Sequence, residues 1–232
     1  HAFSFFLFAA LLVVAPCWFE RPAPAQSLLF GALIGLIALV RLPNLLIVAP
    51  FALYGIRSVG DIAGRLTWFR ERWRALLLVA GMVLLVLFPQ LLIWYAATGR
   101  WFTNPYVGES FSNLANPQLL PVLFSARRGL FIWSPILLLG VVGVHALFRR
   151  APDLAVPVVL VALAQTYLIA SWWAWWYGAG FGHRAFIDIF PALALPLAAF
   201  YDARRTRLGR WLLIGIAVCC GLYTMVLMLQ YW

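Results

Sequence analysis

The sequence predicts an all-α membrane protein: a polytopic bundle of about seven or eight transmembrane helices with one long extracytoplasmic loop. Hydrophobic residues make up 65% of the 232 residues and charged residues only 10%, whereas a soluble domain is about a quarter charged. Apolar runs of about 20 residues, long enough to cross a hydrocarbon core, recur along the chain. We therefore expect one transmembrane domain over residues 1–232, with no separate soluble domain.

The predicted spans follow these apolar runs in order. They cover 2–19, 28–40, 43–56, 75–97, 129–148, 154–172, 185–201 and 211–231. The second and third are ambiguous, because a run of about 13 residues rises only about 20 Å, less than the hydrocarbon core of about 30 Å. Arg41, Pro43 and Asn44 interrupt the sequence there. The segment 28–56 is therefore either two short helices or one long broken helix.

The arginines orient the predicted spans, since basic residues concentrate in cytoplasmic loops. Segment 57–74 carries many of them among tryptophan and phenylalanine, which is typical of an amphipathic helix on the cytoplasmic surface. Alternating spans place the basic pair 149–150 and the basic segment 204–210 on the same side. Residues 98–128 and 171–184 then lie on the extracytoplasmic side, and 98–128 is the one long loop.

The net charge of +10 indicates membrane topology rather than nucleic-acid binding, because the basic residues lie in short loops between spans. Cys17, Cys219 and Cys220 all lie in apolar runs without metal-ligand spacing, so we interpret them as small apolar residues. An apolar run begins directly after His1, without a charged leader segment. We therefore expect the sequence to be a piece of a longer protein.

The stretch 171–184 is the most informative candidate site. Its four tryptophans and Tyr177 are favoured at a membrane–water interface, and three glycines then let the backbone bend. His183 is either an interfacial structural residue, a hydrogen-bond donor, or a proton-transfer group near pH 7. Arg184 and Asp188 are expected to pair on one helix face. That pair is either structural, or it lets Asp188 hold Arg184 on a phosphate or sugar.

Other charged residues on the predicted extracytoplasmic side have alternative interpretations. Arg127 and Arg128 oppose the orientation set by the other arginines, so they form either an anion site for phosphate or a snorkelling helix end. Arg41 lies between two apolar runs, where it is either functional or snorkels to the headgroups. Glu109 is a metal ligand, a general base or a solvated charge.

Three stretches of the chain resemble bacterial membrane glycosyltransferases of the GT-C superfamily, of the protein-mannosyltransferase or aminoarabinose-transferase type. They are GALIGLIALVRLPN at 31–44, RRGLFIWSP at 127–135 and WWYGAGFGHRAFIDIFP at 175–191. The resemblance implies a GT-C fold in the bacterial inner membrane. It also implies transfer of a sugar from a polyprenyl-phosphate donor to a glycan, lipid or protein acceptor on the extracytoplasmic side.

The resemblance also implies that the catalytic acidic residue follows the first span, upstream of this sequence, so the catalytic residue here is unknown. We expect the chain to supply the cradle for lipid phosphate and sugar. The candidate residues are Arg41, Glu109, Arg127, Arg128, Tyr177, His183, Arg184 and Asp188. No metal ligands are expected, although some family members require a divalent cation. A transporter or lipid flippase and a non-catalytic membrane subunit are the alternative functions.

Overall fold

The computed structural model describes residues 1–103, 108–178, 180–204 and 206–231, and these are helices and irregular segments without a β-strand. Among the described residues, five helices are long and apolar enough to cross a membrane. They are Ala2–Glu20, Trp73–Thr98, Pro152–Ser171, Arg184–Asp202 and Arg207–Tyr231. The prediction of an all-α protein with membrane-length helices is therefore confirmed, whereas the larger number of spans stays a prediction.

Two compact units divide the chain. The first, which we call the N-unit, is Ala2–Glu109, and the second, the C-unit, is Ser110–Trp232 together with His1. The boundary falls inside the segment 98–128 that was predicted as a long loop. The prediction of one domain over residues 1–232 stays a prediction.

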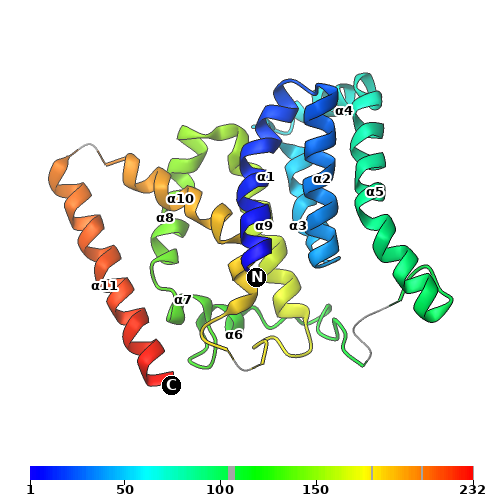
Figure 1. Cartoon of the computed structure of the whole chain (residues 1–232). Coiled ribbons are helices and arrows are strands. Elements are labelled where there is room, and N and C mark those ends of the chain that lie inside the picture. The colour runs from blue at the N-terminus through cyan, green and yellow to red at the C-terminus, as the bar shows by residue number, and fades with distance from the viewer. Residues whose placement is uncertain (104–107, 179, 205, 232) are drawn as a thin grey trace. The chain divides into compact units, whose positions relative to one another are not determined.

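The N-unit contains two long helices, α1 and α5, and several shorter ones (Figure 1). Their bounds are α1 Ala2–Glu20, α2 Pro24–Val40, α3 Asn44–Val48, η1 Ala49–Leu53, α4 Asp61–Glu71 and α5 Trp73–Thr98. Helix α2 packs closely on α5 at Gly31 and Gly35. A Cβ atom on Gly31 would lie 2.6 Å from the Val79 carbonyl oxygen, and one on Gly35 would lie 2.8 Å from Val86 Cβ. Small residues allow this close backbone approach between apolar helices.

The ambiguous segment 28–56 forms two helical pieces. Helix α2 ends at Val40, and Arg41 has an extended backbone with φ −155° and ψ 114°. The chain resumes as α3 and η1, which together end at Leu53. Pro43 explains the interruption, because it lacks an N–H and disfavours helical geometry in the residue before it. The interpretation of two short helices separated near Arg41 is confirmed.

The C-unit is built from α8, α9 and α10, with α11 alongside (Figure 1). Its elements are α6 Leu119–Phe124, α7 Leu130–Trp133, α8 Leu137–Arg150, α9 Pro152–Ser171, η2 Arg184–Ile189, α10 Phe190–Asp202 and α11 Arg207–Tyr231. Gly143 of α8 lies directly on α10, where an added Cβ would contact the Pro196 carbonyl and lie 2.9 Å from Phe200 Cβ. Val161 and Ile189 are fully buried in the core of this unit.

Two predicted spans of the C-unit are not continuous α-helices. The run 129–148 is divided into α7 and α8, since Ser134 leaves helical geometry with φ −139° and ψ 65° directly before Pro135. The run 185–201 begins as the 3₁₀ helix η2 and becomes α-helical only at Phe190. The predicted loop 98–128 contains α6, and its residues 104–107 lie outside the described residues.

Candidate functional site

A tight turn places two arginines directly before α7. The Gly129 N–H donates to the Ser125 carbonyl oxygen over 2.6 Å, which closes the turn. Any side chain at Gly129 would collide with the backbone, since an added Cβ would lie 2.6 Å from the Phe124 carbonyl carbon. Arg127 and Arg128 therefore occupy a turn that depends on glycine for its close approach.

Arg128 joins three segments of the C-unit. Its side chain is only 8% exposed. The guanidinium donates to the Gly182 carbonyl oxygen and to the Tyr231 hydroxyl, each over 3.4 Å. It also lies 5.3 Å from the centre of the Tyr231 ring. These contacts connect the turn before α7, the glycine-rich loop before η2 and the end of α11, so Arg128 has the geometry of a positioning residue.

Arg127 and Arg184, in contrast, are exposed. The Arg127 guanidinium stacks on Trp176, with 4.2 Å between its central carbon and the ring centre. Arg184 lies along the glycine-rich loop, because a Cβ on Gly178 would sit 3.6 Å from one of its terminal nitrogens. Within the described residues, neither side chain makes a hydrogen bond or an ion pair. Their N–H groups are therefore available for bidentate binding of an anion.

The backbone between α9 and η2 bends at residues with left-handed geometry. Tyr177 has φ 51°, Gly178 has φ 70° and Gly182 has φ 59°. Glycine adopts this geometry freely, but a tyrosine there costs about 1 kcal/mol or more. The Tyr177 ring lies 6.0 Å from the His183 ring, centre to centre. Such strain is common where a side chain is held for binding, so Tyr177 remains a candidate binding residue.

His183 is buried beside the two arginine-bearing loops. Its ring is 5% exposed and packs edge-on against Phe186 at 5.0 Å. Neither ring nitrogen makes a hydrogen bond of normal geometry to the described residues. Burial lowers the pKa of His183 to about 4; the carbonyls of Trp175 and His183 oppose this shift, and the Arg128 charge adds to it. The imidazole is thus neutral at pH 7, which favours hydrogen bonding over proton transfer.

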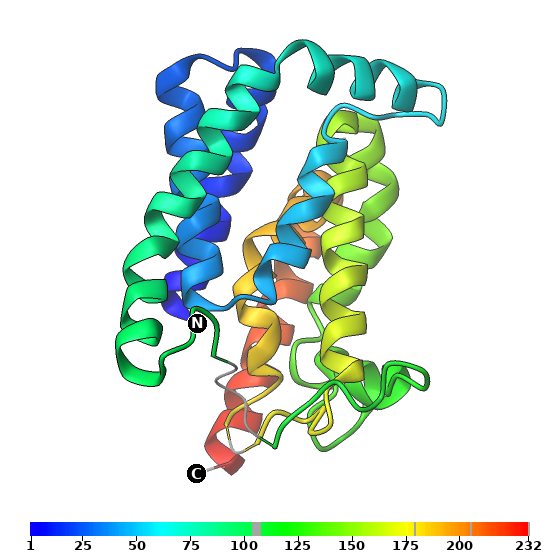
Figure 2. The same ribbon diagram turned by 90° about the vertical axis from the view of Figure 1, so that its right-hand side faces the viewer.

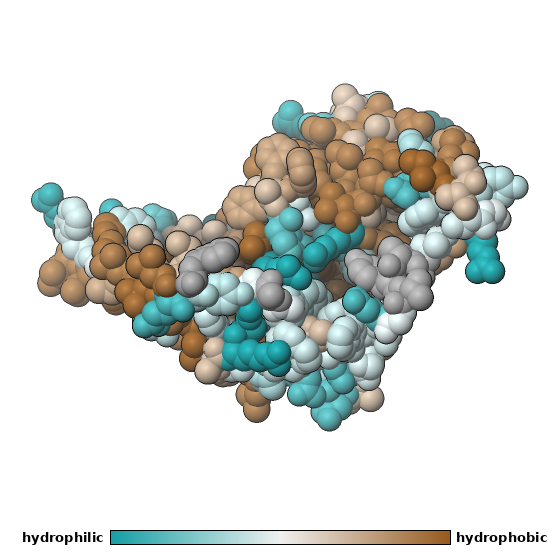
Figure 3. Space-filling view, turned by 60° about the horizontal axis from the view of Figure 1, so that its bottom comes forward, coloured by the Kyte–Doolittle hydropathy of each residue, from teal (hydrophilic) through white to brown (hydrophobic). Residues whose placement is uncertain are grey.

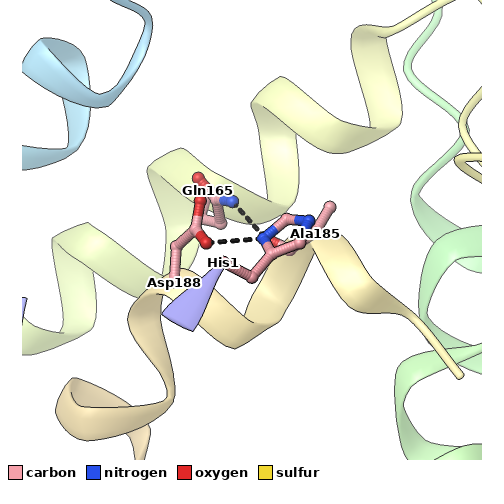
Figure 4. A network of polar contacts seen from close by, with 4 residues as sticks. All are labelled: His1, Gln165, Ala185 and Asp188. Carbon is pink, nitrogen blue, oxygen red and sulfur yellow. Dashed lines mark hydrogen bonds and ion pairs between the residues drawn. The ribbon is translucent and has the colours of Figure 1, made fainter. Parts of the chain in front are cut away.

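Asp188 does not form the expected ion pair with Arg184 among the described residues. The carboxylate is fully buried, and its Oδ1 lies 2.7 Å from Nδ1 of His1 (Figure 4). The Arg184 side chain, in contrast, is exposed. The prediction assumed an α-helix, in which residues four apart share a face. Three residues per turn in the 3₁₀ helix η2 set them about 120° apart. In the same network, Gln165 donates from Nε2 to the Ala185 carbonyl oxygen over 2.6 Å.

Arg41 and Glu109 belong to the N-unit. Arg41 is half-buried at the C-terminal cap of α2, and Glu109 is exposed. All three interpretations of Glu109 stay predictions. The structure thus brings together Arg127, Arg128, Tyr177, His183 and Arg184 in the C-unit, and it places Asp188 in the core of that unit.

The loop-rich end of the C-unit is held together by backbone hydrogen bonds. Asn113 donates from its backbone N–H to the Ser171 carbonyl oxygen over 3.0 Å, and Trp173 donates to Ser110 over 3.1 Å. The Asn113 side chain donates to the Trp172 carbonyl oxygen over 3.1 Å. Parts of 98–128 and 171–184 therefore lie side by side. This is compatible with the prediction that both segments lie on the same side of the membrane. Figure 3 shows hydrophilic residues gathered on the face that it brings forward and hydrophobic residues over other parts of the surface.

An apolar groove of about 260 Å³ lies in the C-unit. Its lining includes Leu130, Phe131, Val158, Ala162, Phe186 and Leu193. Leu130 follows Arg128 by two residues and Phe186 follows Arg184 by two, so one part of the groove adjoins both arginine-bearing loops. Among the described residues, no group of three or more His, Cys, Asp or Glu side chains could hold a metal ion.

Several contacts at this site could not be predicted from the sequence, because they join distant positions. His1 and Asp188 are 187 positions apart, and Tyr231 is 103 positions from Arg128. Trp176 belongs to the stretch 171–184 that was predicted as a candidate site, but its contact with Arg127 was not predicted.

Comparisons with known proteins do not identify the chain: no protein-family model, curated protein or solved structure matches it.

Proposed function

We propose that this chain is part of a membrane glycosyltransferase that moves a sugar from a polyprenyl-phosphate donor to an extracytoplasmic acceptor in the bacterial inner membrane. One observation carries the proposal. Two exposed arginines that make no side-chain hydrogen bond or ion pair among the described residues, Arg127 and Arg184, flank the loop that holds Tyr177 and His183, beside an apolar groove. A donor of this class has two matching parts: a phosphate for the arginines and a long apolar chain for the groove.

In this proposal the arginines act on the leaving group. The acceptor oxygen attacks the anomeric carbon of the sugar, the bond from that carbon to the phosphate oxygen breaks, and polyprenyl phosphate leaves. Arg127 and Arg184 would stabilise the negative charge that develops on the phosphate, which is an electrostatic contribution to catalysis. Arg128 would fix the turn before α7 against the glycine-rich loop before η2. The neutral His183 would form a hydrogen bond with a sugar or phosphate oxygen. The proposal assigns no catalytic acid or base to this chain.

Binding of polyprenyl phosphate tests the proposal without knowledge of the sugar, because every donor of this class releases that product. We expect Arg127→Ala and Arg184→Ala in the full-length protein each to weaken binding about tenfold, since each removes a charge-assisted hydrogen bond. Arg149→Ala is the control, because Arg149 is also exposed but lies at the far end of α8. Equal binding of polyprenyl phosphate and of the uncharged polyprenol would contradict the proposal.

A transporter or lipid flippase is the second candidate. Transporters often place substrate at discontinuous helices, and the N-unit has such an interruption at Arg41, between α2 and α3. Movement of polyprenyl phosphate across reconstituted vesicles, without sugar transfer to any acceptor, would favour this function over the first.

A further inference from the structure

Helix α4 of the N-unit is fixed on one side by an aromatic cluster. The Trp68 ring lies 5.4 Å from Trp18 and 5.3 Å from Phe19, centre to centre. The Arg65 guanidinium lies 4.8 Å from the centre of the Phe19 ring and donates to the Tyr54 carbonyl oxygen. Arg65 and Trp68 are three residues apart and so share one side of the helix. This side of α4 is therefore anchored to the rest of the unit.

A second side of α4 is apolar and exposed. Ile62 is 44% exposed and Leu66 is 64% exposed, and their spacing of four residues places them on one side of the helix. Helix α5 begins at Trp73, directly after α4, and runs for 26 mostly apolar residues, a length of about 39 Å that spans a bilayer. Figure 2 shows α4 lying crosswise to α5. An amphipathic helix at the start of a membrane span lies in the interface, with its apolar side toward the acyl chains.

The acidic side chains of this segment are already engaged. Asp61 accepts hydrogen bonds from the backbone at the start of α4, and Glu71 lies 3.5 Å from the Arg72 guanidinium. Arg70 and Arg74 are exposed, and their side chains make no hydrogen bond or ion pair within the part of the chain that the structure describes. The corner between α4 and α5 therefore presents a positive surface at the level of the lipid headgroups.

We propose that Arg70 and Arg74, with Trp73 between them, form a binding site for the phosphate of anionic phospholipids. Trp73 is 53% exposed, and the Arg74 guanidinium lies 5.5 Å from its ring centre. Tryptophan is favoured at headgroup depth, and guanidinium groups bind phosphate bidentately. The bilayer is the partner that the apolar side of α4 and the start of α5 already require. This inference does not depend on the proposed sugar transfer.

Native mass spectrometry of the full-length protein in neutral detergent, titrated with phosphatidylglycerol or phosphatidylcholine, tests the site. We expect the protein to prefer phosphatidylglycerol, and Arg70→Gln with Arg74→Gln to weaken its binding about 25-fold, about fivefold for each arginine. Arg149→Gln with Arg207→Gln is the matched control, since it removes the same charge from two other exposed arginines and should leave that binding unchanged. Arg70→Lys with Arg74→Lys keeps the charge and should retain part of the binding.

Three results would overturn the inference. One is an unmodified protein that binds both lipids equally. Another is an equal loss of binding in the Arg70/Arg74 variant and in the control, which would show an effect of net charge alone. The third is binding of a polyglutamate peptide through the two arginines without any preference for phosphatidylglycerol, which would assign the surface to an acidic protein.

Discussion

The two units of this protein bury different kinds of polar side chain. The buried polar side chains of the C-unit include three ionisable ones, whereas those of the described N-unit residues are all neutral. The C-unit buries Arg128, Gln165, Ser171, His183 and Asp188, and the N-unit buries Ser4, Ser27 and Asn44.

This difference is one reason why the proposed site is placed in the C-unit. Ionisable groups inside a membrane protein are costly, and they are retained where they are paired or used. In the N-unit, Ser27 satisfies the buried Trp18 by accepting from its Nε1 over 2.9 Å, which is a structural hydrogen bond. In the C-unit, His183 is buried without such a partner among the described residues, beside Arg128. Buried side-chain atoms without a hydrogen-bond partner also occur in the N-unit, at Ser4 and Asn44, so the two units differ in buried ionisable groups rather than in unpaired polar atoms.

The largest predicted effect concerns close helix–helix packing, and it tests whether the two units differ in this packing as well as in buried charge. Gly143→Leu in the C-unit and Gly31→Leu in the N-unit should each destabilise the protein by about 3 kcal/mol or more, because the new side chain would overlap a facing helix backbone. Thermal unfolding in detergent would measure both. Gly81→Leu is the control, since an added Cβ there meets nothing within 4 Å. Tolerance of either scaffold substitution would show that helix contact in that unit is looser than described.

The second prediction concerns the pH dependence of stability that the buried His183 of the C-unit should cause. The pKa of His183 is lowered from 6.5 to about 4, so the unfolded chain takes up a proton before the folded one does. The stability from this group is therefore complete above about pH 6.5 and falls as the pH drops toward 4, by about 2 kcal/mol between pH 7 and pH 5. Thermal midpoints at pH 5, 6 and 7 would measure the loss.

His183→Phe should remove this component of the pH dependence, because phenylalanine fills a similar volume and does not titrate. His145→Phe is the matched control, because His145 is exposed on α8. If the variant at 183 and the unmodified protein lost the same stability between pH 7 and pH 5, the buried neutral imidazole would not be the cause.

Much of the helical structure could be predicted from the sequence. The prediction for 75–97 matches α5 closely, because an uninterrupted apolar run of membrane length has few alternatives to a helix. The stretch 171–184 was identified as a candidate site from its tryptophans and glycines, and that role stays a prediction. The prediction of one continuous span over 129–148 was wrong, because the chain leaves helical geometry at Ser134, directly before Pro135.

The roles of the individual charges could not be predicted. Arg127 and Arg128 are neighbours with the same local pattern, yet one is exposed and the other is 8% exposed. Their difference arises from Gly182 and Tyr231, which are distant in sequence. The expected Arg184–Asp188 pair failed because the choice of a 3₁₀ over an α-helix depends on tertiary packing, which composition does not encode.

The smallest predicted effect concerns Asp61, a charge at the surface of the N-unit. Its Oδ2 accepts backbone N–H groups of Arg57 over 2.9 Å and Ser58 over 2.8 Å. These bonds, led by that from Arg57, lower the pKa of Asp61 below 3.8. The stability that they contribute is present above that ordinary pKa and is lost only as the pH falls further, so the range from pH 7 to pH 5 should leave it unchanged. In that range the stability from His183 should fall, whereas that from Asp61 should stay constant.

Asp61→Asn should therefore speed amide hydrogen exchange at Arg57 and Ser58 without a measurable change in the thermal midpoint. Asn keeps one acceptor oxygen but loses the charge that strengthens both bonds. Ser58→Ala is a useful control, because it removes only the hydroxyl donor to the same carboxylate. If Asp61→Asn instead removed the loss of stability between pH 7 and pH 5, that loss would arise at the surface of the N-unit. The contrast between a surface charge held by backbone hydrogen bonds and a buried imidazole without a partner among the described residues would then fail.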